Sequence, residues 1–255
     1  MLCHIAPVMG IIGYLSYPKN LRIAPTFLQC FSIIHNTFLV GFSAWTFLSL
    51  SKILWERGIV IETRFYFQDP NFDTVICLFY LSKYYEFFDT FLLYLNGKTP
   101  LFLQKFHHIG AVINWHLLYV YKVDAVWTVT LLNSFVHTIM YSYYLCCLLK
   151  INVRFLKQYI TSMQLCQFFV LYSNYYYYYP PVETPFNYFL FNIFGLYGIG
   201  IIYLFGDFYF YTYLQNRAFQ KNKKIHAITS ENLQALLSDN RESNTQTPIF
   251  DNCSE

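Results

Sequence analysis

Apolar runs of about 20 residues recur along almost the whole chain, and this recurrence limits the possible folds most strongly. Of the 255 residues, 56% are hydrophobic and 12% are charged, whereas about 25% of the residues in a soluble domain are charged. We therefore predict an all-α polytopic membrane protein. Its seven spans would lie at about residues 2–17, 25–50, 73–95, 101–121, 125–149, 155–177 and 186–214.

The loops between these spans differ in charge between the two sides of the membrane. One set of loops, with the start of the C-terminal tail, carries ten basic residues, namely Lys19, Arg22, Lys98, Lys150, Arg154, Lys157, Arg217, Lys221, Lys223 and Lys224. The other set carries four, namely Lys52, Arg57, Arg64 and Lys122. Because basic loops tend to stay in the cytosol, we predict a luminal or extracellular N-terminus and a cytosolic C-terminus.

The composition also bears on domain organisation and on several classes of function. Polar residues dominate after position 221, so residues 1–221 would form the membrane domain and residues 222–255 a disordered cytosolic tail. The net charge of +3, without a basic tract interleaved with aromatic residues, argues against nucleic-acid binding. The seven cysteines form no CxxC pair and lie mostly within apolar spans, so we expect neither a structural disulfide nor a zinc site.

Polar and ionisable side chains nevertheless occur within the spans, where they cost free energy unless they pair or line a functional cavity. Helical spacing places them in four stripes, which are Lys83, Glu86, Asp89 and Thr90; Gln104, His107 and His108; Asn133, His137, Tyr141 and Tyr144; and Thr161, Gln164 and Gln167. The four stripes reach a similar depth, roughly 9–12 Å from the cytosolic ends of their spans. We predict one polar pocket, open to the cytosol, with an apolar interior beyond it.

Simpler interpretations of these residues stay open. Lys83 with Glu86 or Asp89 would make a neutralising pair that only holds helices together. Glutamine, asparagine and threonine in a span often form hydrogen bonds between helices. We expect His116 to have a packing or capping role, and we assign no role to the isolated His35.

The stripes resemble the motifs of the ELO family of very-long-chain fatty-acid elongases, which are condensing enzymes of the endoplasmic reticulum membrane. The resemblance covers nearly the whole chain except the tail. The matching motifs are KxxExxDT at residues 83–90, the histidine box HxxHH at 104–108, NxxxHxxMYxYY at 133–144 and TxxQxxQ at 161–167. The resemblance implies seven transmembrane helices, of which six form a barrel around an acyl tunnel.

The resemblance also implies a reaction that needs no cofactor or metal. A long-chain acyl-CoA would condense with malonyl-CoA to give a 3-oxoacyl-CoA that is two carbons longer, with release of CoA and CO2. His107 would attack the thioester and form an acyl-histidine. His108, His137 and Asn133 would stabilise the enolate that forms when malonyl-CoA loses CO2.

The remaining predicted site residues would orient these groups or bind substrate. Asp89 or Glu86 would accept a hydrogen bond from an imidazole N–H and fix its tautomer. Contacts to substrate or CoA would come from Lys83, Tyr141, Tyr144, Gln164, Lys98 and Lys105. The family also implies a ketoacyl-CoA reductase, a dehydratase and an enoyl-CoA reductase as partners, together with membrane lipid and a second copy in a homodimer.

One departure from the histidine box leaves alternatives open. Gln104 replaces the first histidine, and glutamine forms hydrogen bonds but cannot titrate or form an acyl-enzyme. We expect Gln104 to position other groups. One alternative is a catalytically weakened protein that binds acyl-CoA, and another is a seven-helix receptor or transporter. A third is a di-iron desaturase or hydroxylase, although three of the seven histidines, His4, His35 and His226, are poorly placed for ligands.

Overall fold

The computed structural model of this protein describes residues 5–16, 24–59, 65–178, 185–215 and 229–230. The chain divides into two units, residues 1–206 and 207–255. Every secondary-structure element within the described residues is a helix, which confirms the predicted all-α fold. The tail predicted from residue 222 lies, apart from two residues, outside the described part of the chain.

Each of the seven predicted spans contains a helix. The α-helices of the described residues are α1 (Ile5–Leu15), α2 (Pro25–Arg57), α3 (Pro70–Tyr85), α4 (Phe87–Leu95), α5 (Phe102–Val120), α6 (Val126–Leu148), α7 (Lys157–Tyr178) and α8 (Pro185–Tyr209). Short 3-10 turns, η2 (Tyr66–Gln68) and η3 (Arg154–Leu156), precede α3 and α7, and the π-helical turn η4 (Phe210–Gln215) follows α8. Proline is the first residue of α2, α3 and α8. A backbone N–H at this position has no partner within the helix, so the missing N–H of proline costs no hydrogen bond.

Two of the predicted spans differ from the observed helices. The third span is divided into α3 and α4 at Glu86. There the N–H of Asp89 donates to the carbonyl of Glu86, three residues earlier, at 3.1 Å, so the helix tightens into a 3-10-like turn. The second span was predicted to end at residue 50, but α2 continues to Arg57 and then stops at Gly58. Gly58 has a φ of 75°, a value that glycine adopts readily.

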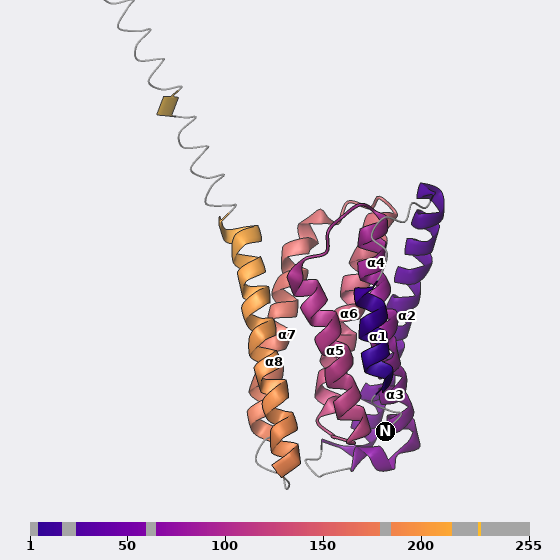
Figure 1. Ribbon diagram of the computed structural model, residues 1–255, viewed down its shortest axis with the longest axis vertical. Coiled ribbons are helices and arrows are strands. Elements are labelled where there is room, and N and C mark those ends of the chain that lie inside the picture. Colours follow the sequence, from indigo (N-terminus) through magenta and orange to yellow (C-terminus); the bar gives the residue numbers. More distant parts are fainter. Residues whose placement is uncertain (1–4, 17–23, 60–64, 179–184, 216–228, 231–255) are drawn as a thin grey trace, which may run out of the picture. The chain divides into compact units, whose positions relative to one another are not determined.

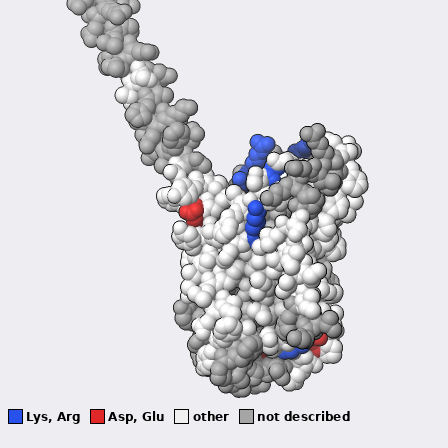
Figure 2. All heavy atoms as spheres, in the orientation of Figure 1, with Lys and Arg blue, Asp and Glu red and all other residues white. Residues whose placement is uncertain are grey.

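Within the first unit the helices lie side by side along one direction (Figure 1). α2 packs along α6, α6 also contacts α7, and α3 contacts α5. At the end predicted to be luminal, a buried aromatic cluster is bordered by two ion pairs, Arg57 with Asp69 and Lys122 with Asp73. Figure 2 shows basic side chains gathered toward the opposite end, and a largely uncharged surface along the helices between the two ends.

The apolar character of the described helices is uneven. By length and hydropathy, the segments Pro25–Arg57 and Tyr188–Gln215 are able to cross a membrane, and α1 is a shorter apolar helix. The helices between them carry the polar stripes, and those side chains lower their mean hydropathy. The seven-span topology and the six-helix barrel therefore stay predictions.

Candidate functional site: a buried histidine centre beside an apolar cavity

Lys83 lies at the centre of a fully buried polar cluster. Its ammonium donates to Glu86 Oε1 at 2.7 Å and to Asn133 Oδ1 at 2.9 Å. His137, one turn after Asn133 on α6, places Nδ1 3.5 Å from the same Glu86 oxygen. The exposed fractions of Lys83 and Glu86 are only 1% and 2%, so both charges are shielded from solvent and rely on each other. The predicted stripes of the third and fifth spans thus meet here.

The two histidines of the box occupy different surroundings on α5. His107 lines a cavity on the side of α7 and α8, and its ring lies edge-on to Phe168. His108 is buried, and its ring lies near Tyr14 of α1 and Phe87 of α4. His108 Nδ1 has no hydrogen-bond partner within the described residues, and His137 Nδ1 has none besides its contact with Glu86 Oε1.

Gln104 lies on the face of α5 that contacts α4. Its side-chain amide donates to Thr90 Oγ1 at 3.1 Å, and the same oxygen lies 3.0 Å from the hydroxyl of Tyr14. These contacts join α5 to α4 and α1. Gln104 does not line the cavity that His107 reaches. Its observed contacts fit the positioning role that we expected.

Asp89 binds different partners from those we predicted. One carboxylate oxygen lies 2.8 Å from His35 Nε2, and the other accepts the hydroxyl of Tyr141 at 2.6 Å. The structure therefore brings Asp89 to α2 and α6, and no hydrogen bond joins it to either box histidine. The side chain of His35, a residue for which the sequence indicates no role, is fully buried. An ionisable residue on an otherwise apolar helix was the available signal, because such a residue needs a partner in the membrane.

The other predicted contact residues make different contacts. Gln164 donates to Met140 Sδ at 3.1 Å, and Tyr144 is 42% exposed beside Tyr141. Lys98 is exposed in the turn after α4, and Lys105 lies over the ring of Tyr94, 5.8 Å from its centroid.

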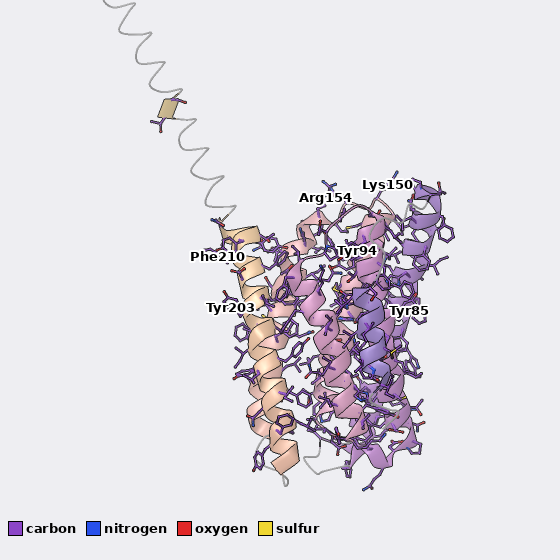
Figure 3. All side chains as sticks on the ribbon, viewed as in Figure 1. Tyr85, Tyr94, Lys150, Arg154, Tyr203 and Phe210 are labelled. Atoms are coloured by element: carbon purple, nitrogen blue, oxygen red, sulfur yellow. The ribbon has the colours of Figure 1, made fainter. Side chains whose placement is uncertain are left out.

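Figure 3 shows Tyr94 toward the end of the bundle at which Lys150 and Arg154 lie. Because Lys105 lies beside Tyr94, this arrangement gathers basic side chains at the end predicted to face the cytosol.

An apolar cavity of about 140 Å³ extends from His107 between α5, α6, α7 and α8. Asn133 also lines it, so the Lys83 centre and the box histidine border the same space. The wall is mostly hydrophobic, and it includes Trp115, Leu118, Val129, Phe168, Leu171, Phe191, Phe194 and Ile201. Along α5 it reaches from residue 107 to residue 118, about 16 Å.

Within the part of the chain that the structure describes, no three histidine, cysteine, aspartate or glutamate side chains gather in a way that would hold a metal ion. His4 and His226 lie outside that part.

The fold and the site together define a class: an apolar helical bundle in which a buried lysine–glutamate–histidine centre borders an apolar cavity. The chain belongs to the ELO, GNS1/SUR4 family, whose model matches residues 7–221. The resemblance noted in the four motifs is thereby confirmed.

Several relatives named as fatty acid elongases are similar to this chain. Fatty acid elongase sre1 of Dictyostelium discoideum is 38% identical over 152 residues, which cover 55% of each chain. Fatty acid elongase A of the same organism is 33% identical over 188 residues, 66% of this chain and 65% of the relative. Very long chain fatty acid elongase 5 of Xenopus tropicalis is 32% identical over 212 residues, 77% of this chain and 70% of the relative. The chain thus spans between half and two thirds of the length of the two Dictyostelium relatives.

Proposed function

We propose that this protein is a fatty acid elongase of the endoplasmic reticulum membrane, which condenses a long-chain acyl-CoA with malonyl-CoA. The observation that carries the proposal is the position of His107, on the wall of an apolar cavity that is also lined by Asn133, the hydrogen-bond partner of the buried Lys83. Such a cavity suits an acyl chain, and the polar centre suits the reacting groups at its end. The family and the names of the relatives support the same conclusion.

The first chemical step transfers the acyl group to the protein. An imidazole nitrogen of His107 attacks the thioester carbon, the carbon–sulfur bond breaks, and CoA leaves as a thiol after taking up a proton. The acyl chain then occupies the cavity, with its carbonyl carbon bonded to His107. Two easier steps thereby replace one difficult step.

The second step forms the new carbon–carbon bond. Malonyl-CoA loses CO2, and the electron pair of the broken bond forms an enolate, whose carbon attacks the acyl-histidine and releases His107. Negative charge develops on oxygen in this step, so nearby fixed donors would lower the barrier. His108 has an unpartnered ring nitrogen for this purpose, and His137 would act through the ring nitrogen that does not face Glu86. Asn133, which lines the cavity, accepts a hydrogen bond from the Lys83 ammonium.

A topology with seven spans, a luminal N-terminus and a cytosolic C-terminus is part of this proposal, as is a six-helix barrel around the acyl tunnel. The basic side chains near Lys150 and Arg154 would then face the cytosol, where both CoA substrates are found. A homodimer and the three other enzymes of the elongation cycle are the proposed protein partners.

The test uses microsomes that contain the protein, labelled malonyl-CoA and a series of acyl-CoAs, without reduced nicotinamide cofactor. We expect a 3-oxoacyl product two carbons longer from the wild type and none from His107→Ala. His116→Gln is the matched control, because His116 lies on the same helix but bonds to Tyr80. Equal product from His107→Ala would refute the acyl-histidine. A folded protein that binds acyl-CoA and gives no product would support the alternative of a binding protein.

A further inference from the structure

Three buried polar side chains interrupt the apolar wall of the cavity. Asn114, Thr128 and Gln167 come from α5, α6 and α7, and all three line the same space. Their exposed fractions are 7%, 6% and 6%, so each is more than nine-tenths buried. The oxygen atoms Asn114 Oδ1, Thr128 Oγ1 and Gln167 Oε1 have no hydrogen-bond partner within the described residues.

The two amide oxygens need a hydrogen-bond donor. Asn114 Nδ2 donates to the Gly110 carbonyl at 2.7 Å, an interaction that leaves Oδ1 as a pure acceptor. Gln167 Oε1 is likewise an acceptor. Asparagine and glutamine in membrane helices usually bond to a neighbouring helix, but these two oxygens make no such bond. Because burying an unpaired acceptor is unfavourable, a cavity of this kind selects an occupant that supplies a donor.

The position of Asn114 fixes where that donor belongs. It follows His107 by seven residues, which is about 10 Å along α5. An extended chain of tetrahedral atoms advances about 1.2 Å per bond, since three bonds span one extended residue. A chain bonded to His107 therefore passes Asn114 roughly nine bonds from its carbonyl carbon.

We propose that the cavity takes an acyl chain with a hydroxyl group near its middle, and that one of the two amide oxygens, Asn114 Oδ1 or Gln167 Oε1, accepts the hydrogen bond of this hydroxyl. The proposal rests on the acyl-CoA condensation proposed above and names the substrate class of that site. An unsubstituted chain fills the same space but leaves both amide oxygens unpaired. A site with buried polar groups discriminates strongly against the analogue that lacks the matching group.

The test compares octadecanoyl-CoA with the same acyl-CoA hydroxylated about nine bonds from the thioester carbon. In competition, we expect the wild type to favour the hydroxylated substrate by about tenfold or more in kcat/KM. A hydroxyl next to the thioester should give no advantage. The double variant Asn114→Leu/Gln167→Leu should lose the preference, measured as the ratio of the kcat/KM values of the two acyl-CoAs.

Asn192→Leu is the matched control, because Asn192 makes the same bond to the carbonyl four residues earlier but is exposed on α8. It should keep the preference. Equal use of both chains by the wild type, or an unchanged preference in the double variant, would overturn this inference and leave the condensation standing. If no acyl-CoA is condensed, the proposed function fails, and the Kd values of the two acyl-CoAs for the purified protein in detergent still decide the preference.

Discussion

Replacement of Lys83 by methionine would remove the one positive charge that pairs with Glu86 while keeping a side chain of similar length. In the native protein the ammonium also lies over two aromatic rings, 3.9 Å from the centroid of Phe79 and 4.8 Å from that of Trp115. The variant leaves the Glu86 carboxylate buried without its cation. Loss of one partner from a buried ion pair typically costs about 3–5 kcal/mol, so we expect the free energy of unfolding to fall by about this amount.

A double-mutant cycle separates the unpaired charge from the loss of packing. Because Lys83→Met/Glu86→Gln removes both charges, we expect it to recover most of the lost stability, with a coupling free energy of about 2–3 kcal/mol. The assay is equilibrium denaturation of all four proteins in mixed micelles. If the double variant is as unstable as Lys83→Met, the charge pair is not the main source of the loss, and this reasoning is wrong.

Two further predictions concern other parts of the bundle. A Cβ atom at Gly110 would overlap the ring of Tyr197, whose hydroxyl donates to the His107 carbonyl at 3.1 Å. Gly110→Ala should therefore lower the free energy of unfolding in mixed micelles by about 1–3 kcal/mol. Gly41→Ala, with no atom within 4 Å of the new Cβ, should not lower it, and equal losses would refute the steric explanation. Asp124 lies between α5 and α6, and burial raises the pKa of its carboxyl from 3.8 to about 6. Because the native state then holds the proton more tightly than the unfolded chain, the free energy of unfolding should fall as pH rises from about 4 to about 6, by at most about 1.4 kcal/mol per unit. The Asp124→Asn variant should lack this slope in a pH series of denaturation curves, and an unchanged slope would assign it to another group.

The helices were largely predictable because their determinants are local. Run length and the prolines at the first positions of α2 and α3 place the starts of those helices within a few residues. The division of the third span at Glu86 was not predictable, because a single tightened turn leaves the helical spacing of Lys83, Glu86 and Asp89 almost unchanged.

The polar site shows the same distinction between near and distant partners. Lys83 and Glu86 lie three residues apart, so helical spacing alone suggested their contact. The partners of Asp89 lie 54 and 52 positions away, at His35 and Tyr141, and no spacing rule connects them. The similar predicted depth of Tyr141 and Asp89 in the membrane indicated that these two residues could meet. The isolated position of His35 in the sequence gave no such indication.

The faces of α5 show what the glutamine in the histidine box changes. Gln104 contacts α4 through Thr90, and His108 lies near Tyr14 of α1 and Phe87 of α4, so both side chains meet α4. His107 instead faces the cavity between α5 and α8. A glutamine at position 104 donates its hydrogen bond to Thr90 at any pH, because its amide does not titrate. The substitution therefore acts at the contact between α5 and α4, and the nucleophile proposed at His107 does not depend on a titrating group at position 104.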